Sequence, residues 1–293
     1  RLGFKSTAIV VALIGGVLTA IAFVIVEARV SNPMLPLKLF KSTTFTGANL
    51  LTLFLYAALS GAMLFLPLNL IQVQGYSATA AGAALLPFIV IMFLLSRWSG
   101  GLIRHYGAKL PLVVGPIIAA TGFVLFMMPG AGTVGADARS YWVTFFPAVV
   151  VLGLGMAVSV APLTTTVMNS VPQNRAGFAS GINNAVSRTA GLLAVAVLGI
   201  VILHTFNAEL DRRLQTLGVT TEVKQALDHE RTRLAAAEVP ATVEPAQGLM
   251  LKQAINESFV AGFRRVAMVC SGLALLSALS AWWLIGGKEV RKG

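Results

Sequence analysis

The chain has 293 residues, of which 56% are hydrophobic and only 11% are charged. Average soluble domains carry about 25% charged residues, so this composition excludes an ordinary soluble domain and indicates a protein that spans a membrane. The formal net charge of +11 is compatible with nucleic-acid binding, but the basic residues stand at the ends of apolar runs, where they mark membrane topology. We therefore expect no nucleic-acid partner.

Seven apolar runs are long enough to cross a bilayer as helices. A spanning helix needs about 20 mostly apolar residues, and none of the runs alternates apolar and polar residues as the strands of a membrane barrel do. The sequence therefore predicts an all-α membrane protein with seven transmembrane helices. The runs cover residues 8–26, 45–71, 79–98, 110–128, 142–168, 178–203 and 262–285.

These runs divide the chain into four parts. Residues 1–42 hold the first span and a cytoplasmic connection, and residues 43–203 hold the next five spans. Residues 204–258 mix acidic and basic side chains and have a helical composition that Pro240 and Pro245 interrupt. We expect this part to be a long, solvated and partly helical extracytoplasmic loop. Residues 259–293 are expected to form the last span and a cytoplasmic tail.

The basic residues of the connections predict the orientation of the spans, because Lys and Arg are enriched on the cytoplasmic side. One side of the membrane holds ten of them and the other side holds five, so we expect the first side, and the C-terminus with it, to be cytoplasmic. The ten are Arg29, Lys38, Lys41, Arg97, Arg104, Lys109, Arg175, Lys288, Arg291 and Lys292, and the five are Arg1, Lys5, Arg139, Arg264 and Arg265.

The second run carries one stripe of polar and polarizable residues at helical spacing. The stripe consists of Asn49, Thr52, Tyr56, Ser60 and Met63. Polar groups within spans are costly in lipid, so they face protein or a water-filled cavity. We predict that this stripe lines a substrate path, where its amide and hydroxyl groups bind polar atoms and its aromatic and thioether groups contact apolar surface. Packing between helices is the alternative.

The connection between the third and fourth runs, SGGLIRHYGAKL, is a basic turn rich in glycine. We expect Gly100, Gly101 and Gly107 to permit close backbone approach there, while Arg104 and Lys109 hold the turn in the cytoplasm. The turn resembles the signature G-x-L-x-D-R-x-G-R-K of the major facilitator transporters. The matching residues are Gly100, Leu102, Gly107 and Lys109, while Arg104, His105 and Ala108 depart from the signature.

Two further stretches resemble the fourteen-span drug:proton antiporters of that superfamily. They are LPLNLIQVQGYSATAAGAALLP, residues 66–87, and APLTTTVMNSVPQNRAGFASGINNAVSRTAG, residues 161–191. The resemblance implies a major-facilitator-type helical bundle, in which one linker span precedes the six-helix bundle of the C-terminal half. An N-terminal half of the same polypeptide, absent from this chain, is expected as its partner.

The resemblance also implies a function. The expected activity is proton-coupled export of small amphiphilic or cationic compounds by alternating access, in a cytoplasmic (inner) membrane and with a possible periplasmic adaptor. A major-facilitator transporter of a metabolite or lipid is an alternative, as is a half-transporter module that needs a separate N-terminal half.

Arg188 is the only charge deep within a run. It lies eleven residues past Gly177, about 16 Å along a helix and near the middle of the membrane. Asn184 lies one turn earlier on the same face. Arg188 either ties this span to its neighbours or takes part in binding anionic groups or in coupling, and we count both residues among the substrate-path candidates. No Asp or Glu lies within a run, so we expect this chain alone not to couple transport to protons.

Neither an enzyme nor a seven-helix retinal protein fits the sequence. His105, His204 and His229 lie outside the runs, and no acids are paired within them, so the groups for membrane-embedded hydrolysis are missing. The last run has no lysine for a Schiff base. Cys270 is the only cysteine, which excludes an internal disulfide and a cysteine-based metal site. We expect no cofactor.

Overall fold

The computed structural model describes residues 7–30, 33, 36–132, 138–240 and 243–286. Within these residues all regular secondary structure is helical. The expected cytoplasmic tail with Lys288, Arg291 and Lys292 lies outside the described residues, as do Arg1 and Lys5.

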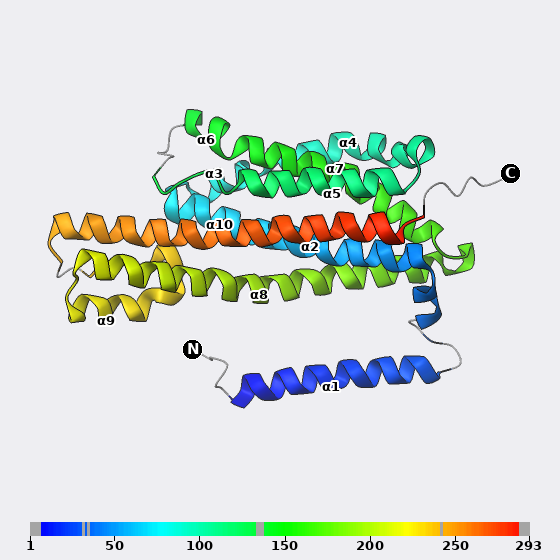
Figure 1. Cartoon of the computed structure of the whole chain (residues 1–293), viewed down its shortest axis with the longest axis horizontal. Helices are drawn as coiled ribbons and strands as arrows, with labels where there is room; N and C mark the ends of the chain where they lie inside the picture. Colours follow the sequence, from blue (N-terminus) through cyan, green and yellow to red (C-terminus); the bar gives the residue numbers. More distant parts are fainter. Residues whose placement is uncertain (1–6, 31–32, 34–35, 133–137, 241–242, 287–293) are drawn as a thin grey trace.

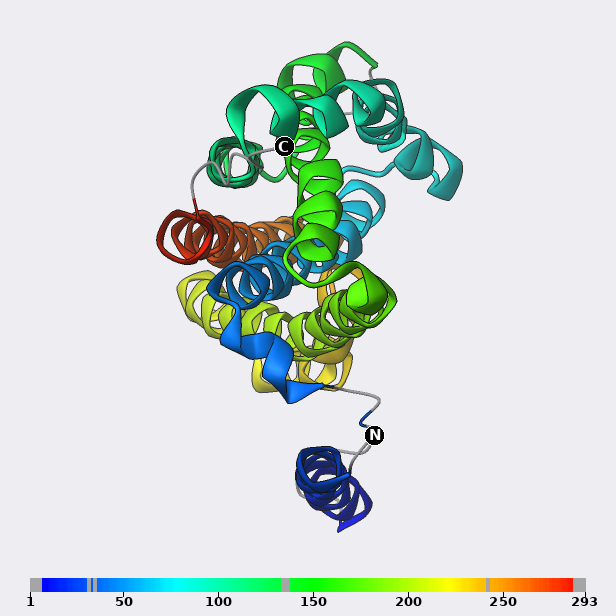
Figure 2. The ribbon, with the colours of Figure 1, turned by 90° about the vertical axis from the view of Figure 1, so that its right-hand side faces the viewer.

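The first helix, α1 (Thr7–Arg29), stands apart from the other helices in both views (Figures 1 and 2). Almost all of its described side chains are exposed, including Leu18 and Val26. Its composition is that of a membrane span, since it has a single acidic residue, Glu27, and ends at a basic one, Arg29. After the 3-10 turn Leu37–Lys41, Ser42 caps the next helix by accepting a hydrogen bond from the Phe45 N–H at 3.3 Å.

Six long helices pack into one bundle. They are α2 (Thr43–Leu68), α4 (Leu86–Tyr106), α5 (Lys109–Leu125), α7 (Phe146–Asn169), α8 (Ala176–Leu217) and α10 (Pro245–Leu284). Short elements join them: a π-helical turn Asn69–Val73 that extends α2, α3 (Ala78–Ala83), α6 (Ala138–Thr144), the 3-10 turn Gln173–Arg175, α9 (Thr221–Glu230) and the 3-10 turn Arg231–Ala236. The helices α2, α8 and α10 run side by side, and α5, α7 and α4 cover them on one side (Figures 1 and 2).

The predicted all-helical membrane architecture is confirmed. Six described helical segments are long and apolar enough to cross a membrane: Val10–Arg29, Thr43–Val73, Ala78–Tyr106, Phe146–Asn169, Gln173–Leu217 and Pro245–Leu284. The span predicted over 110–128 corresponds to α5, a shorter apolar helix of 17 residues. The count of seven spans therefore stays a prediction.

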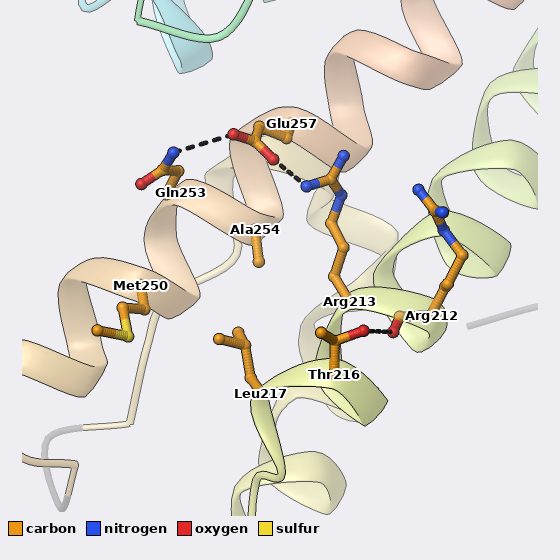
Figure 3. Close-up of a pocket in the computed structure, with 8 residues that line it drawn as sticks. All are labelled: Arg212, Arg213, Thr216, Leu217, Met250, Gln253, Ala254 and Glu257. Carbon is orange, nitrogen blue, oxygen red and sulfur yellow. Dashed lines mark hydrogen bonds and ion pairs between the residues drawn. The ribbon is translucent and has the colours of Figure 1, made fainter.

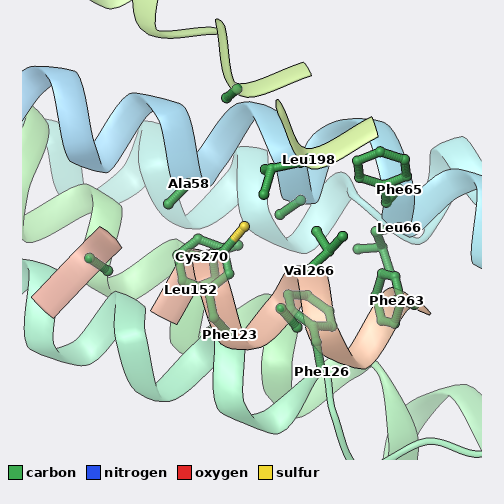
Figure 4. Close-up of a cluster of buried hydrophobic side chains, with 14 of the residues drawn as sticks. Ala58, Phe65, Leu66, Phe123, Phe126, Leu152, Leu198, Phe263, Val266 and Cys270 are labelled. Atoms are coloured by element: carbon green, nitrogen blue, oxygen red, sulfur yellow. The ribbon is translucent and has the colours of Figure 1, made fainter. Parts of the chain in front are cut away.

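The bundle core lies between α10, α2, α8 and α5. Cys270 of α10 is completely buried and lies among Ala58, Phe123 and Leu198 of three neighbouring helices (Figure 4). Nearer the end of α5, the rings of Phe126 and Phe263 meet edge to face with their centroids 6.4 Å apart. The core is mainly apolar, and buried polar groups such as the Ser271 hydroxyl, which donates to the Ala120 carbonyl of α5 at 3.2 Å, are satisfied between the helices.

Close approach of α5 and α7 depends on glycine. A Cβ atom placed on Gly155 would lie 2.7 Å from the Gly115 carbonyl oxygen and 2.8 Å from the Ala119 Cα. Real Cβ atoms do not come so near to backbone, so only glycine allows the two helices to cross at this distance.

Residues 204–258, expected as a partly helical loop, are mostly helical where the structure describes them. They contain the last turns of α8, then α9 and the 3-10 turn Arg231–Ala236, and the first turns of α10. We call this region the outer extension; it projects from one end of the bundle (Figure 1). Pro245 occupies the first turn of α10, where a proline costs no hydrogen bond because the first N–H groups of a helix lack partners.

Arg231 holds the outer extension together. Its side chain is only 14% exposed and pairs with Asp211 at 2.5 Å and with Asp228 at 2.6 Å. It also donates a hydrogen bond to the Asn207 carbonyl at 3.3 Å. Burial lowers the pKa of Arg231, but the hydrogen bonds with the two aspartates outweigh it and raise the pKa. Arg231 therefore stays charged and joins the end of α8 to α9.

Candidate functional site

The N-terminal part of α8 carries five polar residues on one face. They follow the spacing i, i+3, i+4, i+7 and i+8, which places them side by side on a helix. We call them the α8 polar face: Ser180, Asn183, Asn184, Ser187 and Arg188. The next part of the helix, residues 190–203, contains only apolar residues and glycine. The polar face is therefore confined to one section of an otherwise apolar span.

This face is open in the structure. Asn184 and Arg188 are exposed, while Ser180, Asn183 and Ser187 are half-buried. The Ser187 hydroxyl donates to the Asn184 carbonyl of its own helix at 2.9 Å. Within the described part of the chain, the Arg188 guanidinium forms no hydrogen bond and no ion pair.

Asn183 joins the α8 polar face to the polar stripe of α2. Its Nδ2 donates to Thr52 Oγ1 at 2.6 Å and to Asn49 Oδ1 at 3.3 Å. Asn49 and Thr52 are buried, with exposed fractions of 4% and 0%. These two stripe residues therefore face α8 rather than open space.

The hydrogen bonds around Asn183 determine the orientation of its amide. Thr52 Oγ1 donates its only proton to the Ala48 carbonyl at 2.9 Å, and Asn49 Nδ2 donates to the Phe45 carbonyl at 2.9 Å. Thr52 can then offer only an acceptor to Asn183, and Asn49 presents its Oδ1 to the same amide. Asn183 must present its NH2 group to them, so its Oδ1 points away from this pair, and Oδ1 accepts no hydrogen bond from the described residues.

The other three stripe residues also lie along the bundle side of α2. Ser60 packs against α8 so closely that a Cβ on Gly191 would lie 2.9 Å from its Oγ. Tyr56 and Met63 are half-buried and pack against the core. The structure thus brings the α2 stripe together with α8 at Asn49, Thr52 and Ser60, while Asn184 and Arg188 are exposed.

The predicted turn between the third and fourth spans is short. Helix α4 ends at Tyr106 and α5 begins at Lys109. Gly107 has φ +74°, a backbone conformation that favours glycine, and its N–H donates to the Ile103 carbonyl at 2.9 Å. Arg104 is exposed, and the Lys109 ammonium lies 4.7 Å from the centroid of the Trp282 ring, a cation–π contact to α10.

The remaining residues of the turn motif lie within α4 rather than in the turn. Gly100 faces α7, where a Cβ would be 3.9 Å from the Ala161 Cβ, and Leu102 is half-buried. A Cβ on Gly101 would meet nothing within 4 Å. The glycine that this end of the bundle requires is therefore Gly107, for the positive φ of the turn.

A hollow of about 320 Å³ lies between the ends of α8 and α10 in the outer extension (Figure 3). Its charged groups are already paired. Arg213 reaches Glu257 across the two helices and Glu209 on its own helix, and Glu257 also accepts from Gln253 at 3.0 Å. Arg212 pairs with Glu209 at 2.6 Å. This cluster clamps α8 to α10, in contrast to the unpaired guanidinium of Arg188.

Reasoning from the sequence missed Ser180, Asn183 and Ser187 as members of the polar face. The signal that reveals them is the i, i+3, i+4, i+7, i+8 pattern of polar residues between residues 180 and 188, followed by an apolar stretch.

Comparison with known proteins places this geometry in a family context. Residues 1–195 match the family described as the Major Facilitator Superfamily. The chain is 30% identical over 220 residues to the multidrug resistance protein Stp of Mycobacterium tuberculosis, a match that covers 73% of the chain. It is 26% identical over 275 residues, 92% of the chain, to the tetracenomycin C resistance and export protein of Streptomyces glaucescens. It is 32% identical over 200 residues, 67% of the chain, to the cephamycin export protein CmcT of Amycolatopsis lactamdurans.

The chain spans half or less of these relatives. The matched part is 38% of Stp, 49% of the tetracenomycin C export protein and 40% of CmcT.

Proposed function

Because the chain belongs to the major facilitator superfamily, a family of transporters and not of enzymes, we propose that it forms one half of a secondary active exporter of small amphiphilic or cationic compounds. Relatives with the words resistance and export in their names support this direction of transport. We place the protein in a cytoplasmic (inner) membrane with its C-terminus on the cytoplasmic side, as the distribution of Lys and Arg indicates.

The observation that carries the proposal is the open α8 polar face. An arginine facing lipid near the middle of a span costs about 3 kcal/mol, and Arg188 is exposed among the described residues. Its face therefore meets either water or another polypeptide in the membrane. A transporter has such a surface along its substrate path.

The path would run along the α8 polar face, with Tyr56 and Met63 of α2 offering apolar and polarizable surface at its edge. Asn49, Thr52 and Ser60 would act indirectly, because their contacts with α8 hold that helix in position. The facing wall would come from a second helical bundle, and rocking of the two bundles would alternate access to the path. We also consider a periplasmic adaptor protein, bound to the outer extension, as a further candidate partner.

Proton coupling would depend on residues outside the spans of this chain. The sequence has no Asp or Glu between residues 28 and 203 except Asp137, which lies in a connection. Coupling to protons needs a titratable group within the membrane. We propose that the bundle facing this one supplies that group.

Energised efflux of ethidium tests the proposal. Cells that make the complete gene product are loaded with the dye, and efflux is followed with and without an uncoupler. Efflux that stops when the uncoupler is added is the expected result. Efflux no faster than in cells without the gene, for ethidium and for a panel of amphiphilic dyes, would overturn the assignment and favour transport of a metabolite or lipid.

A further inference from the structure

We infer that Arg188 recognises an anionic group, a carboxylate or a sulfonate, on the transported compound. The inference rests on the proposed function, because it assigns a ligand to a face of the proposed substrate path. Among the amphiphilic compounds expected there, it assigns to Arg188 the recognition of those that carry a negative charge at one end, while compounds without such a group would be exported independently of Arg188.

The first argument is the position of the guanidinium. Arg188 lies about 16 Å past Gly177 along α8, deep in the span, and its side chain is exposed. Its side chain is long enough to leave the helix surface, whereas Leu198 of α8 packs on Gly61 of α2 and Ile202 packs on Gly262 of α10. The charge therefore points out of the bundle into the space that a ligand would enter.

The second argument is the missing counter-charge. The ion pairs between described residues all lie in the outer extension, on residues 209–257. Between residues 28 and 203 the sequence has one acid, Asp137, in a connection outside the described residues. An arginine held in a poorly polar environment without an acid nearby attracts anions and repels cations.

The third argument is the neighbouring hydrogen-bond chemistry. Asn184 lies one turn before Arg188 on the same face and its side chain is also exposed. Its amide can donate to one oxygen of an anion while the planar fork of the guanidinium binds two. The Ser187 proton is already committed to the Asn184 carbonyl. The set of free donors thus fits a planar anion such as a carboxylate.

Two dyes that differ at one group test the inference. Rhodamine B carries a free carboxylate, and its ethyl ester does not. We expect Arg188→Gln to slow rhodamine B efflux about tenfold, because the dye loses one charge-assisted hydrogen-bonding partner. Efflux of the ester should change less than about twofold, which is the usual size of the effect of a substitution that removes no contact. Arg188→Lys keeps the charge but loses the planar fork, so we expect an intermediate rate for rhodamine B. Arg97→Gln, an exposed residue near the middle of α4, is the matched control and should leave both rates unchanged.

Dye binding to the purified complete protein shows whether a variant has lost recognition of the dye or has failed to fold. Fluorescence polarisation of rhodamine B should show a Kd about tenfold higher for Arg188→Gln than for the natural protein, with no difference for the ester. An equal loss for both dyes, in efflux and in binding, would overturn the inference and assign Arg188 to pairing with an acid of the protein. Unchanged rates for both dyes would overturn it as well. If the natural protein exports neither dye nor ethidium, the proposed function itself fails.

Discussion

Asn183 Nδ2 lies 2.6 Å from Thr52 Oγ1, and this contact joins two membrane helices that are 131 positions apart in the chain. The Thr52 hydroxyl gives its proton to the Ala48 carbonyl, so it can only accept from Asn183. The pair fixes the side-chain amide of Asn183 and with it the rotation of α8 against α2. Since Asn184 and Arg188 are on the same helix, this rotation also sets where the open side of the α8 polar face points.

Thr52→Val should weaken the contact between α2 and α8. Valine has the shape of threonine but no acceptor, so one N–H of Asn183 loses its partner. Hydrogen bonds between membrane helices contribute on average about 0.6 kcal/mol, and we expect a loss of about 0.5–1.5 kcal/mol in the free energy of unfolding. A double-mutant cycle with Asn183→Ala, measured by thermal unfolding in detergent, checks this. Strictly additive effects of the two changes would contradict the contact.

Gly155→Ala should destabilise the bundle, because the added methyl group would press on the backbone of α5 at Gly115 and Ala119. Overpacking of this kind costs about 1–3 kcal/mol. The matched control is Gly101→Ala, whose methyl group would meet nothing within 4 Å and which should leave the unfolding temperature unchanged or raise it. Equal stability of the two variants would mean that α5 and α7 are farther apart than described.

Gly107→Ala should destabilise the turn between α4 and α5. The residue has φ +74° and ψ 174°, and an L-residue with a side chain pays about 1–3 kcal/mol to adopt such a conformation. Gly100→Ala serves as the control, since its methyl group would make an ordinary contact with Ala161. In detergent, Gly107→Ala should unfold at a lower temperature than Gly100→Ala. The reverse order would contradict the turn described at Gly107.

Arg231→Ala should loosen the outer extension and leave the membrane bundle folded. The change leaves Asp211 and Asp228 without their partner, and loss of one member of a partly buried ion pair costs about 2–4 kcal/mol. Hydrogen exchange should quicken in residues 205–240, while α2 and α5 keep their protection. Arg212→Ala removes a side chain that is 71% exposed, so it should cost less than about 1 kcal/mol. Equal effects of the two variants would contradict the role given to Arg231.

Much of this fold can be predicted from the pattern of apolar residues. The run 45–71 agrees within two residues at each end with the helical segment Thr43–Val73, since length and hydropathy decide where a span can lie. The helical continuation of α8 and α10 beyond the membrane could not be predicted as well. Its charged residues predict a solvated and only partly helical loop, and Pro245 can equally end one helix or begin another.

The candidate site was harder to predict than the fold. Arg188 stands out because a charge within an apolar run is costly. Asn183 does not, because its role depends on Asn49 and Thr52, more than 130 positions earlier in the chain. Periodicity places the α2 stripe on one face of a helix, but only packing shows that this face meets α8.

The measurement that tests the substrate path most directly is the accessibility of the α8 polar face to water. Cys270 is the only cysteine and is buried, so Cys270→Ala provides a background free of cysteine in this chain. Asn184→Cys, on the polar face, is compared there with Leu276→Cys, an exposed apolar position on α10. Thiolates form and react only where water reaches them, so a water-soluble methanethiosulfonate should label Asn184→Cys about tenfold or more faster than Leu276→Cys. Rhodamine B should slow that labelling. Equal labelling of the two positions, or faster labelling of Leu276→Cys, would contradict a water-filled path along α8.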